Sequence, residues 1–278
     1  MCDGVETMVR LDVSVEGRMT SDRVTKSIRQ DWDERARKNA FYYIASWRSD
    51  WDVDSFFDSG EEDYKRLVEP ILNQLSFQMA GKSMVEVGCG AGRMTRSFAR
   101  RFGQVSAVDV STEMQEQGKQ CLSDFSNIQW ILADGATLTG IGTASNSFVF
   151  SYLVLQHLPQ CSLAYGLLRE VIRVLAPGGV FLFQYNGAQK PLMNWRGRTA
   201  WGIVNLFWRA GMKRAGRAVA SGLGLDPEMV GNSWHGVALT ASEVGTVLRD
   251  AGATALRFSG EGTQMAWCWG IKASEDFG

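Results

Sequence analysis

The chain has 278 residues, of which 45% are hydrophobic, enough for one large or two small domains with a sizeable core. Its formal net charge of −1 gives no overall basic field that would favour nucleic acid or an anionic membrane as a partner. The stretch "MCDGVETMVRLDV" carries acids where a signal peptide needs an apolar core, and no run of 18 apolar residues occurs, so we expect a cytoplasmic protein without a transmembrane segment.

The N-terminal part is predicted to hold an arm followed by two helices. Residues 1–24 are polar and show no sustained period, which indicates a flexible arm. In 27–47 and again in 61–79, apolar residues recur every three or four positions, the spacing of an amphipathic helix. Pro70 lies in the middle of the second helix, where a proline introduces a kink. We assign 25–80 to N-terminal helices.

The middle of the chain alternates short apolar strands with helices. Runs such as "SFVFSYLVL" and "GVFLFQY" are apolar throughout, which suits parallel strands that are covered on both faces. Residues 81–186 are therefore predicted to form an α/β core. Strands are expected at 84–87, 105–108, 128–133, 147–153 and 179–185, and helices at 93–102, 112–124 and 162–175.

The C-terminal part, 239–278, is predicted to add a helix and a hairpin. "TASEVGTVLRDAG" opens with a capping box, Thr240 and Glu243, and closes on Gly252. "TALRFSG" and "TQMAWCWGIK" then follow with a short loop between them, which indicates an antiparallel hairpin at the sheet edge. The expected fold is a Rossmann-like three-layer sandwich, α/β, with a seven-stranded, mostly parallel sheet whose last strand is antiparallel. Residues 25–278 would form a single domain.

Three glycines join the first strand of this core to a helix in "VEVGCGAGRMTRSFA" (85–99). The simplest explanation is a tight turn that needs positive φ. A dinucleotide site needs a small residue at the third position of G-x-G-x-x-G/A, and Arg93 stands there. Glu86 precedes the first glycine by two residues, and its charge would oppose a phosphate and favour an ammonium or sulfonium group. The pattern therefore predicts a cationic ligand.

Acidic residues also end the next two strands. Asp109, 21 residues after Gly88, would accept hydrogen bonds from ribose hydroxyls, or else cap the following helix. Asp134 would accept a bond from an adenine amino group, although it is equally suited to a turn. Because the carboxyl ends of parallel strands meet at one edge of a sheet, Glu86, Asp109 and Asp134 together predict a nucleoside site.

Five stretches resemble, in order, the motifs of class I S-adenosylmethionine-dependent methyltransferases of the small-molecule branch: "VEVGCGAGRMTRSFA", "VDVSTEM", "ILADGATL", "FVFSYLVLQHLP" and "IRVLAPGGVFLF". The resemblance covers roughly 80–185. It implies S-adenosylmethionine as cofactor and in-line methyl transfer to a small organic acceptor. One departure is Val149, at a position of the fourth strand that often carries an acid. The cofactor-binding residues that the resemblance implies are Glu86, Gly88, Cys89, Gly90, Asp109, Val110, Met114, Asp134, Gly135, Ala136, Ser151 and Tyr152.

Methyl transfer from a sulfonium needs alignment and exclusion of water, and a general base only where the acceptor loses a proton. His157, just after the fourth strand, and Tyr43 are the candidate catalytic residues, and Gln156 is a candidate substrate contact. The alternative for His157 is a structural histidine bonded to the next loop. No His, Cys or Asp cluster has metal-ligand spacing, so no metal is predicted. "SYLV" replaces the Asn/Asp-Pro-Pro-Tyr motif of many nucleic-acid and peptide-amine methyltransferases, which argues against those acceptors.

A basic insert at 187–238 is predicted to form a helical lid. Residues 187–225 contain seven lysines and arginines and no acidic residue. Interleaved tryptophans, among them Trp195 and Trp201, would suit a hydrophobic or aromatic acceptor that carries an acidic group or an ionisable hydroxyl. The alternatives are a solvated lid and a helix that meets a lipid-like acceptor at a membrane surface. For the whole chain, the competing functions are a dinucleotide-dependent oxidoreductase and a non-catalytic S-adenosylmethionine-binding protein.

Overall fold

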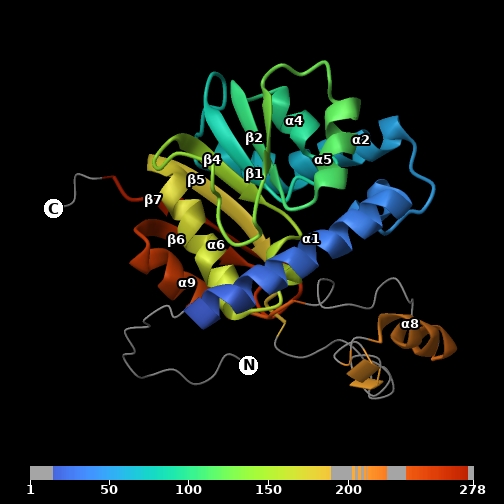
Figure 1. Ribbon diagram of the computed structural model, residues 1–278. Helices are drawn as coiled ribbons and strands as arrows, with labels where there is room; N and C mark the ends of the chain where they lie inside the picture. Colours follow the sequence, from blue (N-terminus) through green and yellow to red (C-terminus); the bar gives the residue numbers. More distant parts are fainter. Residues whose placement is uncertain are drawn as a thin grey trace.

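The computed structural model describes residues 15–188, 202–203, 206–207, 210, 212–223 and 236–274 (Figure 1). Side chains are described from residue 23 onward, except at 213, 214 and 217. The helices are α1 (Val15–Ile44), α2 (Val53–Asp63), the π-helical turn η1 (Tyr64–Val68), α3 (Glu69–Gln74), α4 (Thr95–Ala99), α5 (Thr112–Cys121), the 3-10 turn η2 (Leu155–His157), α6 (Cys161–Val174), α8 (Lys213–Gly222) and α9 (Ala241–Asp250). The strands are β1 (Ser83–Val87), β2 (Gln104–Asp109), β3 (Ile128–Leu132), β4 (Asn146–Ser151), β5 (Leu175–Tyr185), β6 (Ala253–Ser259) and β7 (Ala266–Lys272).

The strands form one seven-stranded sheet in the order β3-β2-β1-β4-β5-β7-β6. Strands β1 to β5 pair in parallel, and β7 is antiparallel to both of its neighbours. The predicted fold class is confirmed. The strand order reverses between β1 and β4, and in open α/β sheets ligands bind beside such a reversal, outside the carboxyl ends of the strands.

Helices cover both faces of the sheet, because successive strand side chains point in opposite directions. Val85 and Val87 pack in the cluster that contains α6 and α9, whereas Met84 packs with η1, α3 and α4. Figure 1 shows α6 and α9 on one side of the sheet and α4 on the other. The apolar runs of the central strands are thus buried on both faces, as predicted.

Helix α1 runs across the carboxyl edge of the sheet and packs on α5 (Figure 1). Its Ala36, Ala40 and Tyr43 are buried in a cluster with Met114 of α5. The helix begins at Val15, inside the stretch 1–24 that the sequence predicts as an arm, and residues 1–14 lie outside the described part of the chain. Within the described residues, no helix has the length and hydropathy needed to span a membrane.

Two predicted helices have different bounds in the structure. The helix expected at 61–79 begins at Val53, where Asp52 accepts a hydrogen bond from Ser55 N, and it passes through a π-helical turn. Pro70 lies in the first turn of α3, directly after the π-helical turn, at a position that tolerates the missing N–H of proline. The helix expected at 93–102 corresponds to α4, which is shorter than predicted. The capping box of Thr240 and Glu243 is present as predicted.

Candidate cofactor and active site

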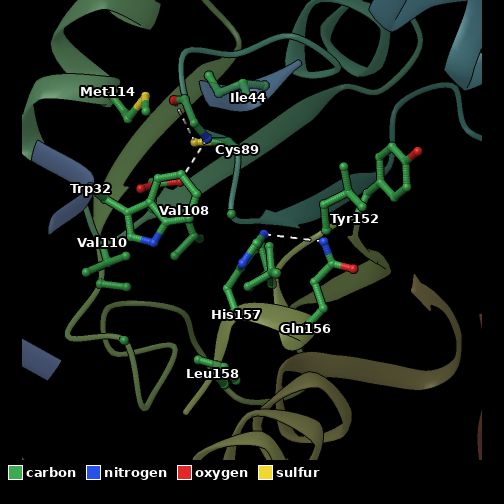
Figure 2. A pocket seen from close by; sticks show the side chains of 18 of the residues that line it. Trp32, Ile44, Cys89, Val108, Val110, Met114, Tyr152, Gln156, His157 and Leu158 are labelled. Carbon is green, nitrogen blue, oxygen red and sulfur yellow. Dashed lines mark hydrogen bonds between the residues drawn. The ribbon is translucent and has the colours of Figure 1, made fainter. Parts of the chain in front are cut away.

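A cavity of about 330 Å³ opens at the carboxyl ends of β1, β2 and β4, beneath α1 (Figure 2). It collects residues from segments far apart in the sequence, which is the usual way a doubly wound sheet builds a ligand site. Twelve of the residues predicted for the site line it: Tyr43, Glu86, Gly88, Cys89, Gly90, Asp109, Val110, Met114, Gly135, Tyr152, Gln156 and His157.

The glycine turn after β1 is fixed by positive φ angles and by close packing. Gly88 has φ +76° and Gly90 has φ +54°. A Cβ at Gly88 would lie 2.0 Å from Val154 Cγ2, so the turn approaches the loop after β4 too closely for a side chain. Gly88 N and Cys89 N both donate to Val108 O, at 2.7 and 3.0 Å, which fixes the turn to the end of β2.

Glu86 is buried at the base of this turn. Its Oε2 accepts a hydrogen bond from Thr95 Oγ1 over 2.5 Å. Burial raises the pKa of the Glu86 carboxyl to about 8, while Thr95 and the charge of Arg93 act in the opposite direction. Because a buried carboxylate is costly without a cation, Glu86 is protonated near neutral pH when nothing balances its charge. A cationic group in the cavity would favour the ionised form.

Asp109 lies at the end of β2 and is held by two backbone N–H groups. Gly90 N donates to Oδ2 and Ser111 N donates to Oδ1, each over 2.8 Å. Loss of contact with water raises the pKa of Asp109, and these hydrogen bonds oppose the shift. Each carboxylate oxygen can accept a further hydrogen bond, and Asp109 lines the cavity. The N-cap role considered for Asp109 belongs to Ser111, whose hydroxyl accepts from Met114 N.

Asp134, by contrast, lies outside the cavity lining and is exposed. Its carboxylate accepts hydrogen bonds from the N–H groups of Ala136 and Thr137, at 2.8 and 2.7 Å. This is the turn role that the sequence left open for Asp134. Ala136 and Ser151 also lie outside the lining, and the buried Ser151 Oγ has no hydrogen-bond partner among the described residues.

His157 and Gln156 face each other at the floor of the cavity (Figure 2), with Gln156 Nε2 3.3 Å from His157 Nε2. The direction of this bond follows from the fully buried Gln184. Its Oε1 must accept from Leu153 N (3.1 Å), because a backbone N–H only donates, so its Nε2 donates to Gln156 Oε1 (3.2 Å).

Gln156 consequently presents its NH₂ group to the imidazole. His157 Nε2 is then the hydrogen-bond acceptor, and in the neutral ring the proton is on Nδ1. This leaves the unprotonated nitrogen of His157 on the cavity side of η2, next to an amide.

Helix α1 supplies the opposite wall of the cavity. Trp32 packs edge-on to His157, with ring centroids 5.4 Å apart, and Ile44 lies over the glycine turn (Figure 2). Tyr43 is buried beside them, and the guanidinium of Arg35 lies 5.2 Å from its ring centroid. Such apolar walls exclude water from the centre of a site.

The far end of the basic insert returns to the cavity. Gly236 lines it, and Gly236 N donates to Gln156 O over 2.7 Å. Trp195 and Trp201, predicted as substrate contacts, lie outside the described residues. Within the described part of the chain, no three His, Cys, Asp or Glu residues are grouped so that they could hold a metal ion.

Comparison with known proteins agrees with this architecture. Residues 85–183 match the family model described as "Methyltransferase domain". The central part of this chain, which forms most of the sheet, is therefore similar to the domain of S-adenosylmethionine-dependent methyltransferases.

Two curated relatives and one solved structure illustrate how similar the chain is to known proteins. Demethylmenaquinone methyltransferase of Tropheryma whipplei is 33% identical over 100 residues, 36% of this chain and 40% of the relative. Trans-aconitate 2-methyltransferase of an Azoarcus species is 30% identical over 136 residues, 48% of this chain and 50% of the relative. The chain thus spans about half the length of these relatives. A structure from Bordetella parapertussis described as a "possible exported protein" shares the fold, with a TM-score of 0.50 and 14% identity over 80% of this chain and 67% of that one.

Some residues of the cavity could not be predicted from the sequence. Trp32 lies in the range 27–47, which the sequence predicts as an amphipathic helix, but a helical period does not say what the apolar face covers. In the sequence, Arg93 is distinguished only by its departure from the dinucleotide pattern. Gln184 looks like one polar residue inside an apolar strand, and that anomaly was the available signal of a functional contact. These residues line the cavity or hold residues that do.

Proposed function

We propose that this chain is a methyltransferase that binds S-adenosylmethionine and transfers its methyl group to a small organic molecule. The observation that carries the proposal is the pair of carboxyl groups in one cavity, Glu86 at the end of β1 and Asp109 at the end of β2. The first suits a cationic group and the second suits a ribose. Two carboxyl groups at these positions, beside a glycine turn, are complementary to a nucleoside that carries a sulfonium and an ammonium group.

The geometry argues against the dinucleotide alternative. A pyrophosphate binds at the N-terminus of a helix that starts directly after the glycine turn. Here α4 starts at Thr95 and is only five residues long, with Arg93 in the position of the third small residue. Glu86 would also place a carboxyl group next to the phosphates. A phosphate-bearing ligand is therefore disfavoured at this turn.

The residues present fit S-adenosylmethionine, which supplies a methyl group activated by a sulfonium. Glu86 and the backbone of Gly88 and Gly90 would border the methionine part. Asp109 would hold the ribose hydroxyls. The side chains of Val110 and Met114 would enclose the adenine, together with Gly135. Trp32 and Ile44 of α1 would exclude water, which an in-line displacement on carbon requires.

His157 is proposed as the base for an acceptor that loses a proton. Its Nε2 accepts a hydrogen bond from Gln156 in the present arrangement. An acceptor O–H or N–H in place of that amide would find the same lone pair. Tyr43 is a second cavity residue with a hydroxyl, and its catalytic role stays a prediction.

The acceptor is proposed to be small, hydrophobic or aromatic, with an acidic group or an ionisable hydroxyl. The two relatives named above act, by their names, on demethylmenaquinone and trans-aconitate, so relatives of this kind take chemically different small molecules. The specific proposal rests on the seven basic residues of 187–225. Replacing Arg209, Lys213 and Arg217 together with Glu should raise the acceptor KM and leave S-adenosylhomocysteine affinity unchanged. Loss of vesicle binding in that variant would instead favour a lipid-like acceptor at a membrane surface.

Titration calorimetry with S-adenosylhomocysteine and with NAD tests the proposal. We expect binding of the first and none of the second. NAD binding alone would overturn the proposal in favour of an oxidoreductase. Once the nucleoside binds, turnover across a panel of phenols, carboxylic acids and amines tests catalysis, and binding without any turnover would favour a non-catalytic binding protein. A cytoplasmic location and the absence of a nucleic-acid partner stay predictions.

A further inference from the structure

Arg93 is a buried cation in the wall of the cavity. Its side chain is only 4% exposed, and the residue lines the cavity next to Tyr152. Its Nη2 donates to Asp63 Oδ2 over 2.7 Å and its Nη1 donates to Ser59 Oγ over 3.3 Å. The guanidinium also lies 5.3 Å from the ring centroid of Trp47. Helix α2 therefore holds Arg93 in one orientation at the methionine end of the proposed site.

The charge of Arg93 is only partly balanced by its neighbours. Asp63 is shared, since it also forms an ion pair with Arg66. Two guanidinium groups thus face one carboxylate, and an arginine in a protein stays protonated. Arg66 reaches water with a side chain that is 67% exposed, whereas Arg93 does not. A buried cation that shares its counter-ion is stabilised by a further anion.

Arg93 and Glu86 belong to the same end of the cavity and interact electrostatically. The charge of Arg93 lowers the pKa of Glu86, against the larger effect of burial. One wall thus offers a carboxyl group and a guanidinium group to a single ligand. An amino-acid zwitterion, with an ammonium and a carboxylate on one carbon, complements that pair.

We propose that Arg93 is the carboxylate receptor of the site and binds the α-carboxylate of the methionine part of S-adenosylmethionine. This inference rests on the proposed function. The described residues engage the guanidinium through two hydrogen bonds, one from each Nη, and a guanidinium has further N–H donors for a carboxylate. Ser59 and Asp63 position the group before the ligand arrives, which lowers the entropy cost of binding.

Ligands that differ only in the carboxylate test this role in the wild-type protein, without any substitution. S-adenosylhomocysteine carries both the ammonium and the carboxylate, and its decarboxylated analogue keeps only the ammonium. Titration calorimetry should give a dissociation constant roughly 10- to 100-fold larger for the analogue, as for loss of one charged hydrogen bond. Equal affinities would overturn the proposal. Absence of S-adenosylhomocysteine binding would overturn the proposed function, and this inference with it.

Two matched variants then assign the effect to Arg93. Arg93→Met should weaken S-adenosylhomocysteine roughly 10- to 100-fold more than it weakens the analogue, because the accompanying rise in the pKa of Glu86 affects the ammonium group of both ligands alike. Arg96→Met is the control, because Arg96 bonds Asp58 and does not line the cavity. It should change neither affinity. A Tm measurement shows that each variant is folded. If Arg93→Met weakens both ligands equally, Arg93 shapes the site without binding the carboxylate.

Discussion

The guanidinium of Arg29 connects helix α1 to the loops that follow β2 and β3. Its Nη2 donates to the carbonyl oxygen of Ala133, just after β3, over 2.7 Å, and its Nε donates to Val110 O over 3.0 Å. Both carbonyls lie past the carboxyl ends of neighbouring parallel strands. The helix that contributes Trp32 and Tyr43 to the cavity is thereby fixed to the end where the adenine is proposed to bind.

Arg29→Met should therefore loosen α1 and weaken ligand binding together. Two partly buried carbonyls lose a charged donor, and we expect the free energy of unfolding to fall by about 1–3 kcal/mol. Urea unfolding measures this. Arg37→Met is the control on the same helix, because the Arg37 side chain is 59% exposed in its ion pair with Glu113. An exposed pair of that kind contributes about 0–1 kcal/mol. Equal losses in the two variants would contradict the special role of Arg29.

Asp109→Asn should weaken S-adenosylhomocysteine binding, whereas Asp134→Asn should leave it nearly unchanged. The amide at 109 removes the charge and presents a donor to one of the N–H groups that Asp109 now accepts from. We expect a loss of about 2–4 kcal/mol in binding free energy. The Asp134 carboxylate accepts hydrogen bonds from the backbone of its own turn and lies outside the cavity lining. Calorimetry on both variants tests whether Asp109 binds the ribose and whether Asp134 binds the adenine. A larger effect at 134 would restore the adenine contact predicted from the sequence.

The sheet and the acids at its edge could be predicted because their signals are local. Apolar runs mark the strands, and Glu86 and Asp109 each stand within two residues of a strand end or a glycine. Strand order then brings them together, since parallel strands share one carboxyl edge. The turn at Asp134 was equally local, and the sequence offered both roles without a way to choose.

Contacts between distant segments could not be predicted in the same way. The buried Arg93 is held by Asp63, which precedes it by thirty residues. Asp63 ends α2, and the sequence predicts the start of this helix eight residues too late. The periodicity of α1 identified an apolar face, but nothing in a helical period says that Trp32 packs on His157. Gln184 acquires its role only when Leu153, Gln156 and Gln264 lie around it. Each of these contacts depends on how the elements pack.

Gly88 and Gly178 have nearly the same φ angle but different surroundings, so alanine variants of the two can distinguish the cost of backbone strain from the cost of a steric clash. Gly88 has φ +76° and Gly178 has φ +74°, but a Cβ meets Val154 at 2.0 Å only at Gly88 and finds open space at Gly178. Gly178→Ala should cost about 1–2 kcal/mol in the free energy of unfolding, from the left-handed conformation alone. Gly88→Ala should cost more and should also reduce S-adenosylhomocysteine affinity. Equal stability losses would show that the loop after β4 moves to accommodate the methyl group.

Ligand affinity should rise with pH through the titration of Glu86. Burial raises the pKa of this carboxyl to about 8, so it holds a proton at pH 7 when the cavity contains no cation. A bound ammonium or sulfonium favours the ionised form, and binding must then release that proton. Between pH 6 and pH 8 the dissociation constant of S-adenosylhomocysteine should fall by up to about tenfold per pH unit. Calorimetry in buffers of different ionisation enthalpy counts the released proton, and Glu86→Gln should abolish both effects.

The same proton should affect the stability of the ligand-free protein with the opposite sign. Because the folded pKa is above the ordinary value of 4.5, the native state binds the proton more tightly than the unfolded state. The resulting stability is fully present below about pH 4.5 and is lost as the pH rises through about 8. Between pH 5 and pH 8 the wild type should therefore lose stability relative to Glu86→Gln. Parallel pH dependences of the two proteins would contradict the raised pKa.

His157→Gln should separate a catalytic histidine from a structural one. Glutamine offers an amide oxygen near the position of Nε2, so the hydrogen bond from Gln156 has a substitute acceptor, but it cannot take up a proton at neutral pH. With an acceptor that must lose a proton, kcat should fall about 10²- to 10⁴-fold, and the low-pH limb of the rate profile should disappear. S-adenosylhomocysteine affinity and the free energy of unfolding should change little. If kcat is unchanged while stability falls, His157 only joins η2 to Trp32 and Gln156, and the proton leaves the acceptor by another route.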